Sequence, residues 1–129
     1  MEAEVIVVGS GFSGTAAAYV LNRAGISVLA LDKNETYPDA FRAEKLEPNQ
    51  AEALRGFGLL NYRQPLVGPI GKTINYRGGV RSEFDTQNQY GIRYGETVNN
   101  FRKALKLKAS IVRAHVTDLK LTNDVQAVV

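Results

Sequence analysis

The sequence contains no cysteine, a single histidine (His115) and no long apolar run. The lack of cysteine excludes disulfides, thiolate metal sites and cysteine nucleophiles, and one histidine excludes a metal site built from several imidazoles. No apolar run approaches the roughly 20 residues that a membrane-spanning helix needs. The N-terminal segment carries acids where a signal peptide carries positive charge. We therefore expect a soluble, cytoplasmic chain without a resident metal.

The sequence also has only a small excess of positive charge. The 16 lysines and arginines nearly balance the 13 aspartates and glutamates, which leaves a net charge of +3. Nucleic-acid binding needs a concentrated basic face. The basic residues between positions 102 and 113 have no aromatic stacking residues among them, so we expect a solvated face and no nucleic-acid partner.

The composition is that of a folded domain, with a hydrophobic fraction of 44% and a charged fraction of 22%. A length of 129 residues suits one compact domain or a piece of a larger one. The sequence stops within Val125–Val129, which has the character of a strand, whereas domains more often end in polar surface segments. We therefore expect that the chain is truncated from a longer protein.

The first ~30 residues follow a strand–helix–strand pattern. The consecutive β-branched residues of Val5–Val8 predict a strand buried on both faces of a parallel sheet. From Ser13 the apolar residues take helical spacing, and Gly25 is a natural stop for that helix. A second apolar strand, Ser27–Leu31, ends in Asp32. The pattern predicts an α/β fold with a Rossmann-like βαβ unit.

The rest of the chain is less regular, and residues 33–47 are polar with no clear period. Later segments show helical spacing, alternation of apolar and polar residues, or a Gly78-Gly79 turn pair. They predict a helix over Pro48–Gly56, a hairpin over 72–85, a helix over Thr97–Lys108, and two or three strands in 110–129 divided near Thr122.

A glycine-rich motif lies between the first strand and the first helix. It reads Gly9-Ser10-Gly11-Phe12-Ser13-Gly14 and matches G-x-G-x-x-G. Gly9 permits a tight turn, Gly11 lets the backbone approach a pyrophosphate, and Gly14 lets helix and strand pack closely. The free amides and the dipole at the helix start favour phosphate, and the hydroxyls of Ser10 or Ser13 are further candidate donors.

Asp32 follows at the end of the second predicted strand. A carboxylate at this position accepts hydrogen bonds from both ribose hydroxyls and repels a 2′-phosphate. The pattern therefore favours a nucleotide with a free adenosine ribose over NADP. Each feature also has an alternative interpretation. Asp32, considered apart from the glycines, would be a solvated loop acid. The glycines would form a strand–helix turn that binds no ligand.

The N-terminal segment also resembles a known signature. It reads VIVVGSGFSGTAAAYVLNRAGISVLALDKN and is similar to the FAD-binding signature of the glutathione-reductase-type flavoproteins, although their usual terminal acid is Glu rather than Asp32. The resemblance implies that Asp32 and the adjacent Lys33 contact FAD. The disulfide oxidoreductase branch needs a redox cysteine pair, and the amine-oxidase branch carries an Arg-x-Gly-Gly-Arg run. This sequence has neither.

A second stretch narrows the resemblance. Phe41–Pro48 is similar to the Arg-containing segment of aromatic-ring hydroxylases of the p-hydroxybenzoate hydroxylase type, and of related flavin monooxygenases and prenyl reductases. This implies that Arg42 contacts the FAD pyrophosphate, a role that suits a bidentate guanidinium. The alternative for Arg42 is a surface salt bridge with Glu44 or Asp39.

Two further positions follow from the same resemblance. In the family, a helix places an Arg or Gln against the cofactor. Aligning on Leu105 alone selects Arg102 for that role, whereas aligning on Phe101 as well selects Val98. The backbone of Val116, after the strand that begins at Ser110, would contact the adenine edge. The neighbouring His115 is interpreted as a surface or strand-packing residue rather than a catalytic base.

The resemblance implies the FAD-binding part of a flavin-dependent monooxygenase, reduced by NAD(P)H, which hydroxylates a small aromatic or isoprenoid substrate. Residues 1–129 would form its N-terminal FAD-binding domain, with 62–95 a possible excursion into a substrate domain. We identify no catalytic side chain. One alternative is an NAD-binding Rossmann module, which the Arg42 stretch disfavours. The other is a folded fragment that binds FAD weakly and has no activity of its own.

Overall fold

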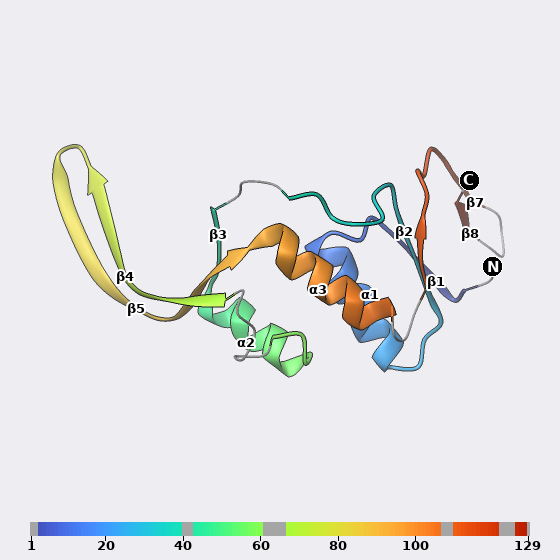
Figure 1. Ribbon diagram of the computed structural model, residues 1–129, viewed down its shortest axis with the longest axis horizontal. Coiled ribbons are helices and arrows are strands. Elements are labelled where there is room, and N and C mark those ends of the chain that lie inside the picture. The colour runs from blue at the N-terminus through green and yellow to red at the C-terminus, as the bar shows by residue number, and fades with distance from the viewer. Residues whose placement is uncertain (1–2, 40–42, 61–66, 107–109, 122–125, 129) are drawn as a thin grey trace. The chain divides into compact units, whose positions relative to one another are not determined.

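The computed structural model describes residues 3–39, 43–60, 67–106, 110–121 and 126–128 (Figure 1). The chain divides into two compact units. The first unit comprises Met1–Asp39 and Val98–Val129, and the second comprises Ala40–Thr97. A parallel sheet lies in the first unit and an antiparallel sheet in the second, which confirms the predicted mixed α/β class.

The parallel sheet of the first unit has the order β1-β2-β6. The strands β1 (Val5–Val8) and β2 (Val28–Asp32) are joined through helix α1 (Phe12–Arg23). The third strand, β6 (Ser110–Arg113), pairs with the other side of β2. The predicted βαβ unit is therefore confirmed, and β2 is the central strand of the sheet.

The core of the first unit lies between this sheet and two helices. Ala18 of α1 and Leu105 of α3 (Tyr94–Lys106) are fully buried and pack with Val28 and Ala30 of β2. The small side chain of Ala18 allows the helix to approach the sheet closely. Burial of these apolar groups is the main favourable contribution to folding in this region.

The prediction that β1 is buried on both faces is wrong. Val7 packs against the core, but Val8 remains 57% exposed. Neighbouring side chains of a strand point to opposite faces, so Ile6 and Val8 point away from the face that carries Val7. Strand β1 is also the end strand of the described sheet. Its β-branched composition reflects strand propensity more than complete burial.

The antiparallel sheet of the second unit has the order β3-β5-β4. Its strands are β3 (Ala43–Leu46), β4 (Val67–Arg77) and β5 (Val80–Arg93), and helix α2 (Pro48–Gly56) packs against β5. The buried apolar residues of this unit are Leu46, Ala51, Leu54, Leu59, Leu60 and Ile92. Helix α2 has the predicted bounds, with Pro48 in its first turn and a capping box between Glu47 and Gln50.

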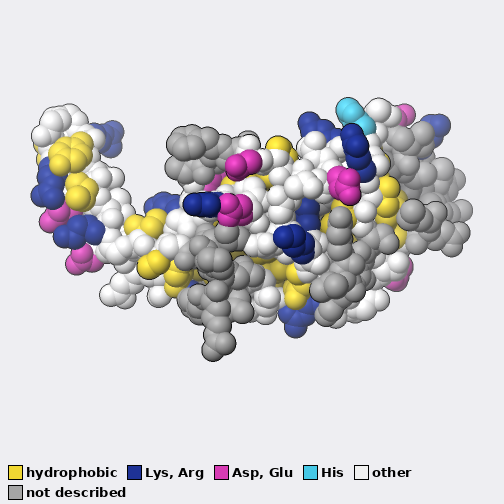
Figure 2. Space-filling model, in the orientation of Figure 1, with side chains coloured by type: hydrophobic (Ala, Val, Ile, Leu, Met, Phe, Trp, Pro, Cys, Tyr) yellow, Lys and Arg dark blue, Asp and Glu magenta, His cyan; other side chains and the backbone are white. Residues whose placement is uncertain are grey.

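The hairpin of β4 and β5 confirms the prediction over 72–85 and is longer than predicted. Arg77 pairs with Val80, and both Gly78 (φ +58°) and Gly79 (φ +78°) have the positive φ of a type I′ turn. Beyond Ile70 the hairpin exposes apolar side chains, including Tyr76 at 72%. Figure 2 shows hydrophobic and basic side chains side by side on this hairpin.

Strand β3 is absent from the sequence prediction, because residues 43–46 are half charged and have no apolar alternation. The strand forms by pairing with the far end of β5, where Ala43 lies opposite Arg93. Helix α3 begins at Tyr94 rather than at Thr97. The Thr97 hydroxyl donates to the Arg93 carbonyl, so this residue bonds back into the first turn instead of capping it.

The C-terminal part contains β7 (Leu119–Leu121) and β8 (Gln126–Val128), which pair antiparallel. With β6 they account for the predicted strands, while Lys108 and the predicted division near Thr122 lie outside the described residues. Among the described helices, none has the length and apolar character needed to cross a membrane.

Candidate functional site

The glycine-rich turn lies at the end of β1 and is held tightly by backbone contacts. Gly9 has φ +87°, and its N–H donates to the Leu31 carbonyl of β2 at 2.7 Å. A Cβ atom at Gly14 would lie only 1.9 Å from the Gly9 carbonyl oxygen. The close contact between turn and helix therefore requires glycine at position 14, and the positive φ favours it at position 9.

Ser10 connects the turn to the rest of the first unit. Its N–H donates to Asp32 Oδ2 at 2.7 Å, and its carbonyl accepts from Thr15 Oγ1 at 2.9 Å and from Arg102 Nε at 2.7 Å. The Ser10 hydroxyl is buried and has no hydrogen-bond partner among the described residues. The turn thus retains a donor for which the described chain supplies no acceptor.

The start of α1 is suited to an anion. Gly11 occupies the N-cap position in extended conformation and offers no side chain to the first-turn amides, and the first turn contains no acidic residue. The positive end of the helix dipole is therefore not neutralised by an acid of its own first turn. The Phe12 ring packs against Phe101 with centroids 5.2 Å apart, whereas Ser13 is exposed.

Asp32 ends the central strand β2 and is held from three sides. Oδ2 accepts from the Ser10 N–H, Oδ1 accepts from the Asn34 N–H at 2.8 Å, and Arg102 Nη2 lies 2.9 Å from Oδ2. Burial by itself raises the pKa of Asp32, but the two backbone N–H groups and the Arg102 guanidinium outweigh burial and leave this pKa below its ordinary value. The carboxylate is therefore ionised at neutral pH.

Arg102 on α3 is buried, and its Nε and Nη1 atoms donate hydrogen bonds within the chain. Besides the Ser10 carbonyl, it donates from Nη1 to the carbonyls of Asn34 (2.9 Å) and Glu35 (3.2 Å). Its guanidinium carbon also lies 5.6 Å from the centroid of the Tyr37 ring. The Arg102 side chain thus connects the turn before α1 to the loop after β2 through hydrogen bonds.

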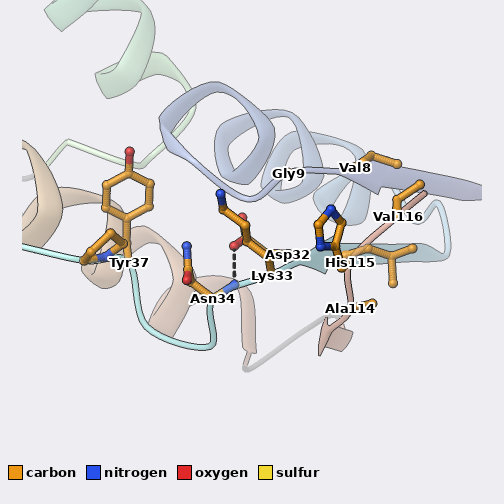
Figure 3. Close-up of a pocket in the computed structure, with 11 residues that line it drawn as sticks. Val8, Gly9, Asp32, Lys33, Asn34, Tyr37, Ala114, His115 and Val116 are labelled. Carbon is orange, nitrogen blue, oxygen red and sulfur yellow. Dashed lines mark hydrogen bonds between the residues drawn. The ribbon is translucent and has the colours of Figure 1, made fainter. Parts of the chain in front are cut away.

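A cavity of about 410 Å³ opens beside Asp32, at the carboxyl ends of β1, β2 and β6 (Figure 3). Figure 3 shows Asp32 and Lys33 between Tyr37 on one side and His115 and Val116 on the other. The lining residues are Val8, Gly9, Leu31, Asp32, Lys33, Asn34, Tyr37, Pro38, Ala114, His115 and Val116. Ligands of open α/β sheets bind at this end of the strands, and the volume is in the range of small-molecule sites.

The structure brings several of the predicted site residues together. Gly9, Asp32, Lys33 and Val116 all line the cavity, and the glycine-rich turn from Ser10 to Gly14 adjoins it. Arg102 forms an ion pair with Asp32 but does not itself line the cavity. The predicted Arg42 lies outside the described residues. His115 is exposed, as predicted for a surface residue, and it also lines the cavity.

Sequence reasoning missed the residues that shape the loop after β2. The Asn99 side chain accepts a hydrogen bond from the Tyr37 N–H at 2.8 Å and donates one to the Tyr37 carbonyl at 3.0 Å. Tyr37 in turn lines the cavity and lies near the Arg102 guanidinium. No local motif marks either residue, because the contact joins segments far apart in the chain.

The residues present fit the adenosine diphosphate half of a dinucleotide. An ionised carboxylate ends the central strand, a glycine turn and an uncapped helix start adjoin it, and the cavity continues past β6. The carboxylate offers an acceptor for ribose, and the helix start offers donors and positive potential for a diphosphate. The unpartnered Ser10 hydroxyl is a further donor within this turn.

Comparison with known proteins agrees with this interpretation. Residues 2–122 match the family model described as "FAD binding domain". The chain is 29% identical over 132 residues to squalene epoxidase of Schizosaccharomyces pombe and 31% identical over 97 residues to squalene monooxygenase of Rattus norvegicus. These alignments cover 95% and 75% of this chain but only 29% and 16% of the two relatives.

Solved structures show the same fold. The p-nitrophenol 4-monooxygenase PnpA from Pseudomonas putida superimposes with a TM-score of 0.86 at 22% identity, over 99% of this chain and 36% of that one. The flavin-dependent monooxygenase PieE, solved with FAD and substrate, superimposes with a TM-score of 0.82 at 14% identity, over 99% of this chain and 26% of that one.

The chain spans less than a third of the length of the curated relatives named above. It belongs to the FAD binding domain family, and FAD is its cofactor.

Proposed function

We propose that the chain is the FAD-binding part of a flavin-dependent monooxygenase that takes its electrons from NAD(P)H. The observation that carries the proposal is the ionised Asp32 at the end of β2, beside both a cavity and the open start of α1. The curated relatives named as squalene epoxidase and squalene monooxygenase support the reaction class. The bound flavin supplies the redox chemistry, and the chain's own residues bind and orient it.

We propose that different residues of the first unit bind the ribose, the adenine and the diphosphate of FAD. Asp32 accepts from the adenosine ribose, the Val116 backbone contacts the adenine edge, and Lys33 lies beside the same ligand. The amides that follow Gly11 bind the diphosphate. Arg42 stays a prediction as a pyrophosphate ligand, since it lies outside the described residues.

We further propose that residues 62–95 belong to a substrate-binding region of the parent enzyme. The hairpin supports this, because Ile74, Tyr76, Val80 and Phe84 are 45–72% exposed. Exposed apolar groups on a long hairpin are a feature of surfaces that another segment covers. The structures similar to this chain are also much longer than it is.

The substrate of the parent enzyme is proposed to be an isoprenoid hydrocarbon, which the names of the curated relatives favour. The alternative is a small aromatic compound, favoured by the name of the similar structure PnpA. Cytoplasmic location stays a prediction.

Titration of the 129-residue chain with FAD, ADP and NAD tests the proposed cofactor role. We expect FAD and ADP to bind weakly and saturably, with flavin absorbance changing on binding, and we expect no NADH-driven oxygen uptake by the chain alone. The Gly11→Val variant should lose at least about a hundredfold in affinity, because its side chain blocks the approach of the diphosphate. The matched control is Gly68→Val in the hairpin, where an added Cβ meets no neighbour. Equal affinities of wild type and Gly11→Val would contradict the site.

A further inference from the structure

We propose that Arg102 is a positioning residue that limits Asp32 to a single ribose hydroxyl, accepted through Oδ1. The sequence pattern instead predicts that this carboxylate accepts from both hydroxyls. The inference rests on the proposed adenosine site and specifies how that site contacts its ligand. It also changes the role of Arg102, which the family resemblance would place against the cofactor.

Two nitrogen atoms of the chain lie against Asp32 Oδ2. The Ser10 N–H donates to this oxygen at 2.7 Å, and Arg102 Nη2 lies 2.9 Å from it. A carboxylate oxygen has about two acceptor positions. The Arg102 contact is an ion pair whose N–H groups are not aligned as hydrogen bonds, but a nitrogen at this distance still fills the space that a hydroxyl oxygen would need. The Ser10 N–H therefore fills one acceptor position of Oδ2, and the Arg102 Nη2 atom excludes a hydroxyl from the space beside it.

Asp32 Oδ1 has one hydrogen-bond donor from the chain. This oxygen accepts from the Asn34 N–H at 2.8 Å, which leaves about one acceptor position on it. The side chain retains 11% exposure and lines the cavity. A ligand in the cavity thus meets a carboxylate with about one accessible acceptor position, which lies on Oδ1.

Arg102 itself is held in place by backbone carbonyls. Its Nε bonds the Ser10 carbonyl and its Nη1 bonds the carbonyls of Asn34 and Glu35, while its side chain is only 3% exposed. The guanidinium fork therefore holds both backbone segments that flank the carboxylate. Rotation of Asp32 to present both oxygens would break the ion pair and the Ser10 bond together, and leaving a buried charge without its partner is costly. A lysine cannot reproduce this set of contacts, because its ammonium group lacks the planar fork.

Binding of ADP, 2′-deoxy-ADP and 3′-deoxy-ADP to wild type and Asp32→Asn, followed by NMR titration, tests the inference. We expect one deoxynucleotide to bind wild type about tenfold more weakly than ADP, as for a lost hydrogen bond to a charged group. The other should bind within about twofold of ADP, and the tenfold difference should shrink in Asp32→Asn. Equal losses for both deoxynucleotides, or no loss for either, would overturn the inference while leaving the adenosine site standing. Failure of ADP to bind wild type would overturn the proposed site and this inference with it.

The role of Arg102 is tested with Arg102→Gln, after circular dichroism has established that the variant folds. If Arg102 has a positioning role, the affinity of each deoxynucleotide relative to ADP should differ between this variant and wild type. The reason is that Asp32 Oδ2 becomes available to a ribose hydroxyl. A uniform loss for all three nucleotides would reduce Arg102 to a structural residue. Lys103→Gln, an exposed neighbour on the same helix, is the matched control and should leave the ratios unchanged. Because the wild-type measurement needs no variant, the inference stays falsifiable even if Arg102→Gln does not fold.

Discussion

The two units of the chain use charge in different ways. In the first unit Arg102 and Asp32 form an ion pair whose side chains are 3% and 11% exposed, and the arginine also bonds three backbone carbonyls. In the second unit Lys45 and Glu47 form an ion pair whose side chains are 47% and 43% exposed. Exposed pairs contribute little to stability, whereas a buried pair becomes essential once it has formed. The comparison indicates that the proposed nucleotide site is held by the same contacts that hold the fold around it.

The largest expected effect is the difference between breaking these two ion pairs. Arg102→Met should lower the free energy of unfolding by about 3–5 kcal/mol, because it leaves Asp32 partly buried without its cation. Lys45→Met should change it by less than about 1 kcal/mol. Urea denaturation followed by circular dichroism measures both. Similar losses for the two variants would remove the distinction between the units.

The next effect concerns two glycines, one from each unit. Gly14→Ala should destabilise the protein by about 3 kcal/mol or more, since its Cβ would lie 1.9 Å from a backbone carbonyl oxygen. Gly56→Ala, at the end of α2, should be neutral or stabilising by up to about 1 kcal/mol, because an added Cβ meets no atom there. Thermal unfolding of the two variants measures the contrast, and a stable Gly14→Ala protein would show that the turn is held less tightly than the structure indicates.

A smaller effect is expected at acid pH. The pKa of Asp32 is lowered in the folded chain, so its contribution to stability is complete above the unfolded pKa of about 4 and is lost as pH falls through the folded pKa. Stability of wild type should therefore fall with decreasing pH below about 4 more steeply than that of Asp32→Asn. Asp118→Asn, at an exposed position, should keep the wild-type slope. Identical slopes for wild type and Asp32→Asn would mean that the carboxylate is not held as the structure shows.

The contrast between local and distant contacts explains what the sequence could predict. The βαβ unit, α2 and the Gly78-Gly79 hairpin depend on short-range periodicity and turn chemistry, and all three are confirmed. Strand β3 depends on pairing with the far end of β5, which no local pattern marks.

The candidate site also contains both local features, which the sequence predicts, and distant contacts, which it does not. The glycine-rich turn and Asp32 are local features and were predicted, and the structure places them together. The bonds from Arg102 to Ser10 and from Asn99 to Tyr37 join residues 92 and 62 positions apart. Composition and spacing carry no information on such pairs, so the ion pair between Arg102 and Asp32 Oδ2 appears only in the structure.

The central claim is that the carboxyl ends of β1, β2 and β6, with the start of α1, bind the adenosine diphosphate half of FAD. An amide-resolved NMR titration of the chain with ADP tests it most directly. We expect saturable shifts at the amides of Gly11, Ser13 and Val116, with those of Gly78 and Gly79 unmoved. Saturation without shifts at the first three amides, or no saturable shift at all, would contradict it.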